Sequence, residues 1–176
     1  MSTGEWIVIG LRLVIPLLIL RYWLLGGIVA MVLDALDVVI IELIGHGGFG
    51  SHYAELDKIL DTYYLSLELF VAWRWTNPWT RWPAIVLFVV RLVGVVLFEI
   101  VDQHYILFIF PNLFENWWLY CVFVLRFFPK LEPKSVRSVI IPMVLLLIPK
   151  MIQEYVLHVA EAEPWNWTKE IILHSR

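Results

Sequence analysis

Four aspartates stand as two pairs in the apolar N-terminal part of the chain, Asp34 with Asp37 and Asp57 with Asp61. Spacings of three and four residues place the two members of each pair on one face of a helix. Carboxylates that meet at the edge of a bilayer repel each other and are costly to desolvate, so we expect a positive group among them. A divalent cation is the simplest such group, because hard cations take carboxylate oxygens. In the alternative interpretation, the four acids cap helix ends at the membrane interface and are solvated.

The segment between the two pairs predicts a helical hairpin. Three glycines lie in four residues between His46 and Ser51, and such a run favours a tight turn over regular structure. We therefore expect one helix to end before this turn and another to begin after it. A hairpin of this kind brings all four carboxylates to one place.

The composition is that of a membrane protein. Of the 176 residues, 61% are hydrophobic, whereas a soluble domain has about 45–50% apolar residues. We expect an all-α, polytopic membrane helix bundle that forms a single integral membrane domain over residues 1–176. The one cysteine, Cys121, excludes an intramolecular disulfide and a cysteine-based metal site.

About six segments of the chain are suited to crossing a bilayer, which takes about 20 mostly apolar residues. The expected spans are residues 6–20, 23–44, 53–75 and 84–101, a fifth that ends near Phe128, and 136–158. Loops are expected at residues 76–83 and 129–134, and a short connection begins at 102–104. We leave open whether residues 110–116 continue that connection or start the next helix. Residues 161–176 predict a short interfacial segment, and the ten tryptophans are expected to anchor span ends.

This layout sorts the charged residues by side of the membrane. The acids expected on one side are Glu5, Asp34, Asp37, Glu42, Glu55, Asp57, Asp61, Glu99, Asp102, Glu115, Glu154, Glu161 and Glu163. The bases expected on the other are Arg21, Arg74, Arg81, Arg126, Lys130, Lys134 and Arg137. Cytoplasmic loops carry the excess of Lys and Arg, so this rule places the acidic face outside the cell.

Localisation and partners follow from the membrane character. We expect an integral protein of the cell (plasma) membrane, with membrane lipids as its partners. A homodimer is left open, and no nucleic-acid partner is expected.

Three motifs carry a resemblance to a known family. Asp34-Ala-Leu-Asp37 and Leu56-Asp57-Lys-Ile-Leu-Asp61 are similar to the opening and the close of one signature, and Leu11-Arg12-Leu-Val-Ile-Pro16 is similar to the helix before it. Over residues 6–76 the chain thus resembles the CDP-alcohol phosphatidyltransferases, which are six-helix membrane enzymes.

The resemblance implies a transferase that joins a CDP-activated group to an alcohol, releases CMP and serves phospholipid synthesis. It implies Mg²⁺ or Mn²⁺ in a two-metal site with Asp34, Asp37 and Asp57 as ligands. Asp61 would complete the ligand set and act as the general base, the catalytic group that takes the proton of the acceptor hydroxyl. Such an enzyme needs its acidic face in the cytoplasm, where CDP-lipids are presented.

Differences from the signature keep other functions open. Val38 stands where the family has Gly, and Ile41-Glu42 stands where it has Ala-Arg. In the family, the Gly and the Arg make room for the CDP moiety and contact it. The alternative is a cation-binding transporter or channel, or a non-catalytic membrane subunit, on the same scaffold.

Other ionisable residues of the expected spans are candidates for polar sites inside the membrane. They are Arg12, Glu42, Glu68, Arg91, Glu99, Glu154 and His158. A buried carboxylate needs a partner or a proton, so we expect Glu68 to form an ion pair with Arg12 or Arg91. A proton or cation path through Glu68 is the alternative.

A polar stripe marks the last expected span, formed by Lys150, Gln153, Glu154 and His158. Glu154 and His158 lie four residues apart, so they share a helix face and are suited to metal binding or a proton relay. A purely structural role for the stripe is the alternative.

Overall fold

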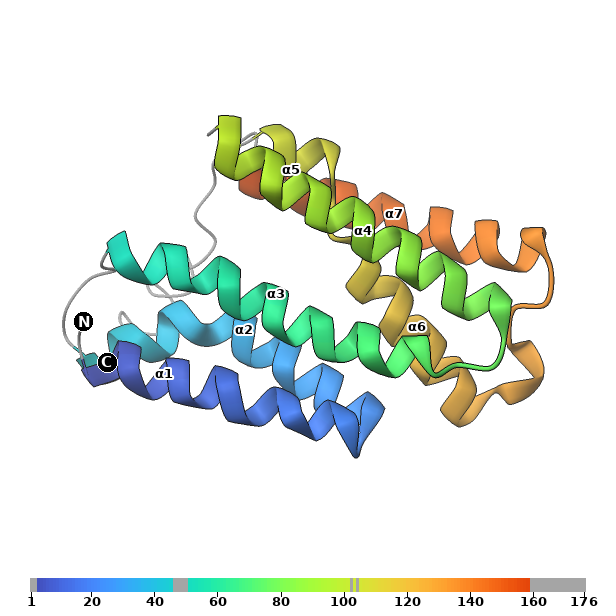
Figure 1. The fold of residues 1–176 in the computed structure, drawn as a ribbon, viewed down its shortest axis with the longest axis horizontal. Helices are drawn as coiled ribbons and strands as arrows, with labels where there is room; N and C mark the ends of the chain where they lie inside the picture. Colours follow the sequence, from blue (N-terminus) through green and yellow to red (C-terminus); the bar gives the residue numbers. More distant parts are fainter. Residues whose placement is uncertain (1–2, 46–50, 102, 104, 159–176) are drawn as a thin grey trace, which may run out of the picture. The chain divides into compact units, whose positions relative to one another are not determined.

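The computed structural model describes residues 3–45, 51–101, 103 and 105–158 (Figure 1). Side chains are described over the same ranges, except those of residues 42, 43, 51–55, 157 and 158. This part of the chain consists of helices and short connections without a strand, which confirms the expected all-α fold. The predicted turn at residues 46–50 and the predicted interfacial segment at residues 161–176 lie outside the described residues.

Five helices in the described ranges are long and apolar enough to cross a membrane, which confirms the membrane helix bundle. These spans are Thr3–Leu20, Trp23–Ile41, Pro78–Val101, Tyr105–Phe127 and Val136–Val156. The third expected span forms a helix, α3 (Ser51–Trp73), but it carries four charged residues between Asp57 and Glu68 and is not among the five. Its passage through the membrane stays a prediction.

The described chain divides into two compact units. Unit 1 comprises the described residues up to Leu67, and unit 2 comprises those from Glu68 onward. The division falls inside α3, so one continuous helix contributes to both units. The single domain expected over residues 1–176 stays a prediction.

Unit 1 is built from α1 (Thr3–Val14), the 3-10 helix η1 (Ile15–Leu20), α2 (Trp23–Gly45) and the first part of α3. Pro16 lies in the first turn of η1, where its missing N–H leaves no helical hydrogen bond unmade. η1 packs so closely on α2 that a Cβ atom on Gly26 would lie 2.3 Å from the backbone nitrogen of Ile19. α1 and α2 lie side by side (Figure 1), and Val8 packs against Ile41 in their shared core.

Unit 2 contains the end of α3 together with α4 (Pro78–Val101), α5 (Tyr105–Ile109), α6 (Leu113–Phe127), η2 (Pro129–Leu131) and α7 (Val136–His158). α7 has the predicted bounds, although Pro142 and Pro149 lie inside it. Its outer face carries an apolar stripe at helical spacing, formed by Ile141, Leu145 and Ile148, which are all more than half exposed. Such a stripe is suited to contact with lipid chains.

The loop predicted at residues 76–83 is too long, because α4 begins at Pro78. The side-chain Oδ1 of Asn77 accepts a hydrogen bond from the backbone N–H of Trp79 at 2.9 Å, as an N-cap residue does. Proline is favoured at the first helical position because its ring fixes a helical φ. The pair Asn77-Pro78 therefore marks a helix start rather than the middle of a loop.

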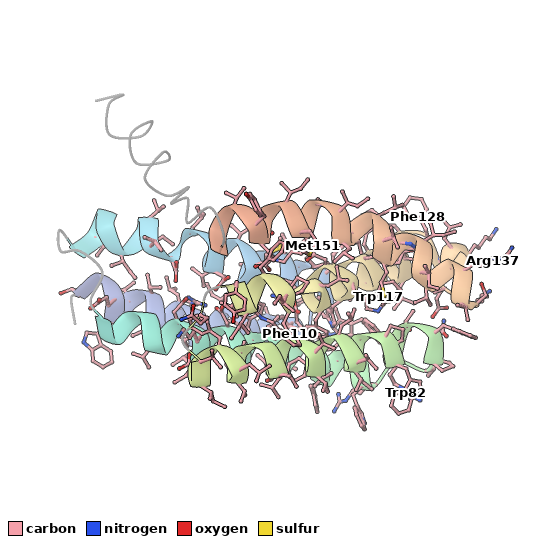
Figure 2. All side chains as sticks on the ribbon, turned by 90° about the horizontal axis from the view of Figure 1, so that it is seen from above. Trp82, Phe110, Trp117, Phe128, Arg137 and Met151 are labelled. Atoms are coloured by element: carbon pink, nitrogen blue, oxygen red, sulfur yellow. The ribbon has the colours of Figure 1, made fainter. Side chains whose placement is uncertain are left out.

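Residues 110–116, for which the sequence left two alternatives, contain a break between α5 and α6. α6 begins at Leu113 and has Glu115 in its first turn, which is the helix-start alternative. Asn112 precedes it, but its side-chain Nδ2 donates to Glu115 Oε2 at 3.3 Å and does not cap the helix. At the break, Phe110, which Figure 2 labels, lies so close to α4 that a Cβ on Gly94 would be 2.3 Å from its own Cβ.

Two of the tryptophans expected to anchor span ends are instead core residues of unit 2. Trp117 and Trp118 are fully buried, and Figure 2 places Trp117 among the helices. The indole N–H of Trp117 donates to the Thr80 carbonyl at 3.2 Å, and that of Trp118 donates to the Glu68 carbonyl at 2.7 Å. Trp82, by contrast, is 54% exposed, as anchoring requires.

Candidate metal centre

Arg12 of α1 stands at the centre of the four aspartates. Its Nη1 donates to Asp37 Oδ2 at 2.6 Å and also to Asp57 Oδ1, while its Nη2 donates to Asp34 Oδ1 and Asp61 Oδ1. The guanidinium is almost completely buried, with 3% of the side chain exposed. The positive group expected among the carboxylates is therefore present as a side chain of the protein.

Three of the four aspartates also converge on one another. Carboxylate oxygens of Asp34, Asp57 and Asp61 all lie within 4.8 Å of each other. These three side chains are about one-third exposed, at 30%, 36% and 30%. All three side chains therefore remain partly accessible to solvent.

Asp37 differs from the other three. Its side chain is only 5% exposed, and it does not belong to the converging group. One carboxylate oxygen accepts from Arg12, and the other accepts from the backbone N–H of Val38. With both oxygens engaged, Asp37 holds Arg12 in place, whereas the sequence predicts it as a metal ligand.

Local structure explains why these groups meet. Asp34 on α2 lies one turn from Asp37, and Asp57 lies one turn from Asp61 on α3, so each helix presents its pair on one face. The hydroxyl of Tyr63 donates to the backbone carbonyl of Leu13 at 3.0 Å. This bond fixes α3 against the residue that follows Arg12.

The donor set fits a hard divalent cation. Two oxygens on opposite sides of Mg²⁺ lie about 4.2 Å apart, and those around larger cations lie further apart. The oxygens of Asp34, Asp57 and Asp61 lie no more than 4.8 Å from one another, which is near enough for a shared cation. Arg12 offsets one of the four negative charges, so a cation placed on Asp34, Asp57 and Asp61 would lower the remaining repulsion.

The ion pair predicted between Glu68 and Arg12 or Arg91 is wrong for the described residues. Arg12 donates to the aspartates, and neither carboxylate oxygen of Glu68 has a hydrogen-bond partner. Arg91 on α4 likewise has a buried Nη1 without a hydrogen-bond partner.

The remaining predicted site residues with described side chains, Glu99 and Glu154, belong to unit 2. Glu154 forms a buried ion pair with Lys150 on α7, with 3.1 Å between Nζ and Oε1, and Lys150 also donates to Gln153. Glu99 is exposed on α4. The side chains of Glu42 and His158 lie outside the described residues, so the proposed metal or relay pair of Glu154 with His158 stays a prediction.

Comparison of the chain with protein-family models, curated proteins and solved structures finds no match. The resemblance to the CDP-alcohol phosphatidyltransferases therefore stays a prediction from the motifs quoted above.

Proposed function

We propose that this integral membrane protein is a divalent-cation-dependent transferase of a phosphate-linked group, with its centre at Asp34, Asp57 and Asp61. The convergence of three carboxylate oxygens within 4.8 Å, on side chains that remain partly exposed, carries the proposal. Phosphoryl-type transfer is the chemistry for which hard cations on clustered aspartates are suited. The resemblance over residues 6–76 supplies the reaction class.

Each residue of the centre has its own proposed role. Asp34, Asp57 and Asp61 would hold Mg²⁺ or Mn²⁺, which supplies neutralisation of the donor's pyrophosphate. Arg12 keeps the carboxylates together, and Asp37 keeps Arg12 in position. The acceptor oxygen forms a bond to the donor phosphorus, the bond from that phosphorus to CMP breaks, and the acceptor proton passes to Asp61.

The test is CMP release by the purified protein in lipid nanodiscs. The donor is CDP-diacylglycerol, and the acceptors are inositol, serine or glycerol 3-phosphate, offered one at a time. We expect release with Mg²⁺ or Mn²⁺, and a loss of about 10²–10⁴-fold in Asp61→Asn, as for removal of a general base. Glu132→Gln, which changes an acid in the connection before α7, should release CMP like the wild type. Release without a divalent cation, or equal release by Asp61→Asn, would contradict the proposal.

The placement of Lys and Arg favours a second function, cation transport. Lys130, Lys134 and Arg137 lie in and just after the connection between α6 and α7, and Arg137 is exposed at the start of α7 (Figure 2). Cytoplasmic loops carry such residues, which would put the aspartates outside the cell and away from CDP-lipids. A topology reporter inserted after Lys130 distinguishes the two functions. A reporter outside the cytoplasm agrees with the transferase, and a cytoplasmic one favours the transporter.

A further inference from the structure

Glu68 is a fully buried carboxylate whose hydrogen-bonding capacity is unused. Its exposed fraction is 0%, and neither Oε1 nor Oε2 has a hydrogen-bond partner. A carboxylate in such a place costs several kcal/mol unless it is paired or takes up a proton. No cation of the described residues bonds to the Glu68 carboxylate. An exchangeable ligand is therefore the remaining way to give this carboxylate a bonding partner.

A second buried acid faces Glu68 from α6. The indole of Trp118 donates to the Glu68 carbonyl at 2.7 Å, which sets this part of α6 against α3. Glu115 lies three residues before Trp118, so it shares the face of α6 that meets α3. Glu115 is 8% exposed, and two acids buried on helix surfaces that meet repel each other when both are ionised.

A chain of polar contacts leads from this pair toward α7. Asn112 donates through Nδ2 to Glu115 at 3.3 Å and through its backbone N–H to Glu154 Oε1 at 3.2 Å. Glu154 pairs with Lys150, which contacts the exposed Gln153. These contacts hold Glu115 and Glu154 in place between α6 and α7.

The ligand that the two acids are suited to bind is a proton. The described charged side chains of α4, α6 and α7 that are not exposed are Arg81, Arg91, Glu115, Lys150 and Glu154. Among the described residues, only the aspartates of unit 1 bring three carboxylate oxygens close enough for a metal ion, so Glu68 and Glu115 lack that donor set. Two neighbouring carboxylates in a membrane interior bind one proton between them, because both cannot stay ionised.

We propose that Glu68 and Glu115 form a proton-binding site inside unit 2. A proton from water adds to one carboxylate and makes it a neutral carboxylic acid, which ends the repulsion between the two acids. Release of the proton to water reverses this step. The site involves none of the aspartates of unit 1.

Infrared difference spectroscopy of the protein in lipid nanodiscs tests this site. A protonated carboxyl group has a carbonyl stretch that is separate from the carboxylate bands. We expect the wild type to show such a band at neutral pH, Glu68→Gln to lose it, and Glu115→Gln to shift its frequency because the neighbouring acid is removed. Glu132→Gln should leave the size and the frequency of the band unchanged.

Two results would overturn the proposal. The first is a band of unchanged size and frequency in both Glu68→Gln and Glu115→Gln, measured on variants whose helix content by circular dichroism equals that of the wild type. The second is a band that disappears when choline chloride is replaced by NaCl at constant ionic strength, because the pair then binds Na⁺ in place of a proton.

Discussion

Arg12 decides the electrostatics of unit 1 at the scale of single residues. Its guanidinium bonds to all four aspartates, and the planar fork of arginine suits such multiple contacts. One positive charge among four negative ones leaves a centre that still attracts a cation. The same residue therefore allows the cluster to fold and leaves part of the charge for a ligand.

Replacing Arg12 with Gln should destabilise the protein strongly. Removing one partner of a buried ion pair leaves uncompensated charges and costs about 3–5 kcal/mol. We expect a loss of that size in the free energy of unfolding, measured by denaturant titration in mixed micelles with a chelator present, and a partial recovery when Mn²⁺ is added. Arg21→Gln is the control, because Arg21 is exposed and only stacks on Tyr22. Equal stability of the two variants would refute the central role of Arg12.

The residue pattern predicts part of this centre. The i,i+3 and i,i+4 spacings of the aspartates indicate two acidic helix faces, and the structure brings those faces together. The bonds of Arg12 to the aspartates, and the position of Asp37 apart from the other three, are not visible in the sequence. Both depend on how α1 packs against α2 and α3, which no local pattern encodes. Glu68 shows the same limit, because its burial without a partner results from packing against α6.

At the scale of elements, η1 approaches α2 closely at Gly26. A Cβ there would lie 2.3 Å from the nitrogen of Ile19 and 2.6 Å from its Cα. Both atoms belong to the backbone, so the helices must separate to make room. Gly10 on α1 differs, because a Cβ at that position meets no atom within 4 Å.

Alanine substitutions at these two glycines should change stability in opposite directions. Gly26→Ala should lower the free energy of unfolding by on the order of 1–3 kcal/mol through overpacking. Gly10→Ala should raise it by up to about 1 kcal/mol, because alanine is the better helix former. Unfolding in mixed micelles measures both, and a stabilising Gly26→Ala would show that η1 does not approach α2 so closely.

Element bounds follow the sequence closely where hydropathy and capping signals agree. α7 begins and ends as predicted, since a charged loop precedes it and its apolar run is continuous. α4 starts earlier than predicted, because Asn77-Pro78 is an N-cap with a first-turn proline, and such pairs also occur in loops. Residues 110–116 signal a helix start at the break between α5 and α6, whereas the close approach of Phe110 to Gly94, sixteen positions away, has no local signal.

At the scale of the whole molecule, the apolar exterior of the helices is suited to contact with lipid chains. Helices α4 and α7 expose large aliphatic side chains, whereas the buried charged residues of α3, α6 and α7 in unit 2 are Glu68, Glu115, Lys150 and Glu154. An exterior of this kind is expected in a bilayer, where burying charge between helices is the alternative to placing it in hydrocarbon. Composition alone predicts this inversion, whereas the particular buried acids emerge only from the fold.

Binding of a divalent cation should stabilise the whole molecule by mass action. A ligand that binds only the folded state adds about 2.7 kcal/mol at one hundred times its dissociation constant. Stabilisation by Mn²⁺ should therefore depend on the carboxylates of Asp34, Asp57 and Asp61 and on no acid of the loops.

Mn²⁺ binding to the protein in nanodiscs, followed by the loss of the electron paramagnetic resonance signal of free Mn²⁺, tests the central claim most directly. We expect saturable binding to the wild type and to Glu132→Gln, competition by Mg²⁺, and strongly weakened binding to the double variant Asp57→Asn, Asp61→Asn. The absence of saturable binding to the wild type, or equal binding to the double variant, would contradict a metal centre at these aspartates.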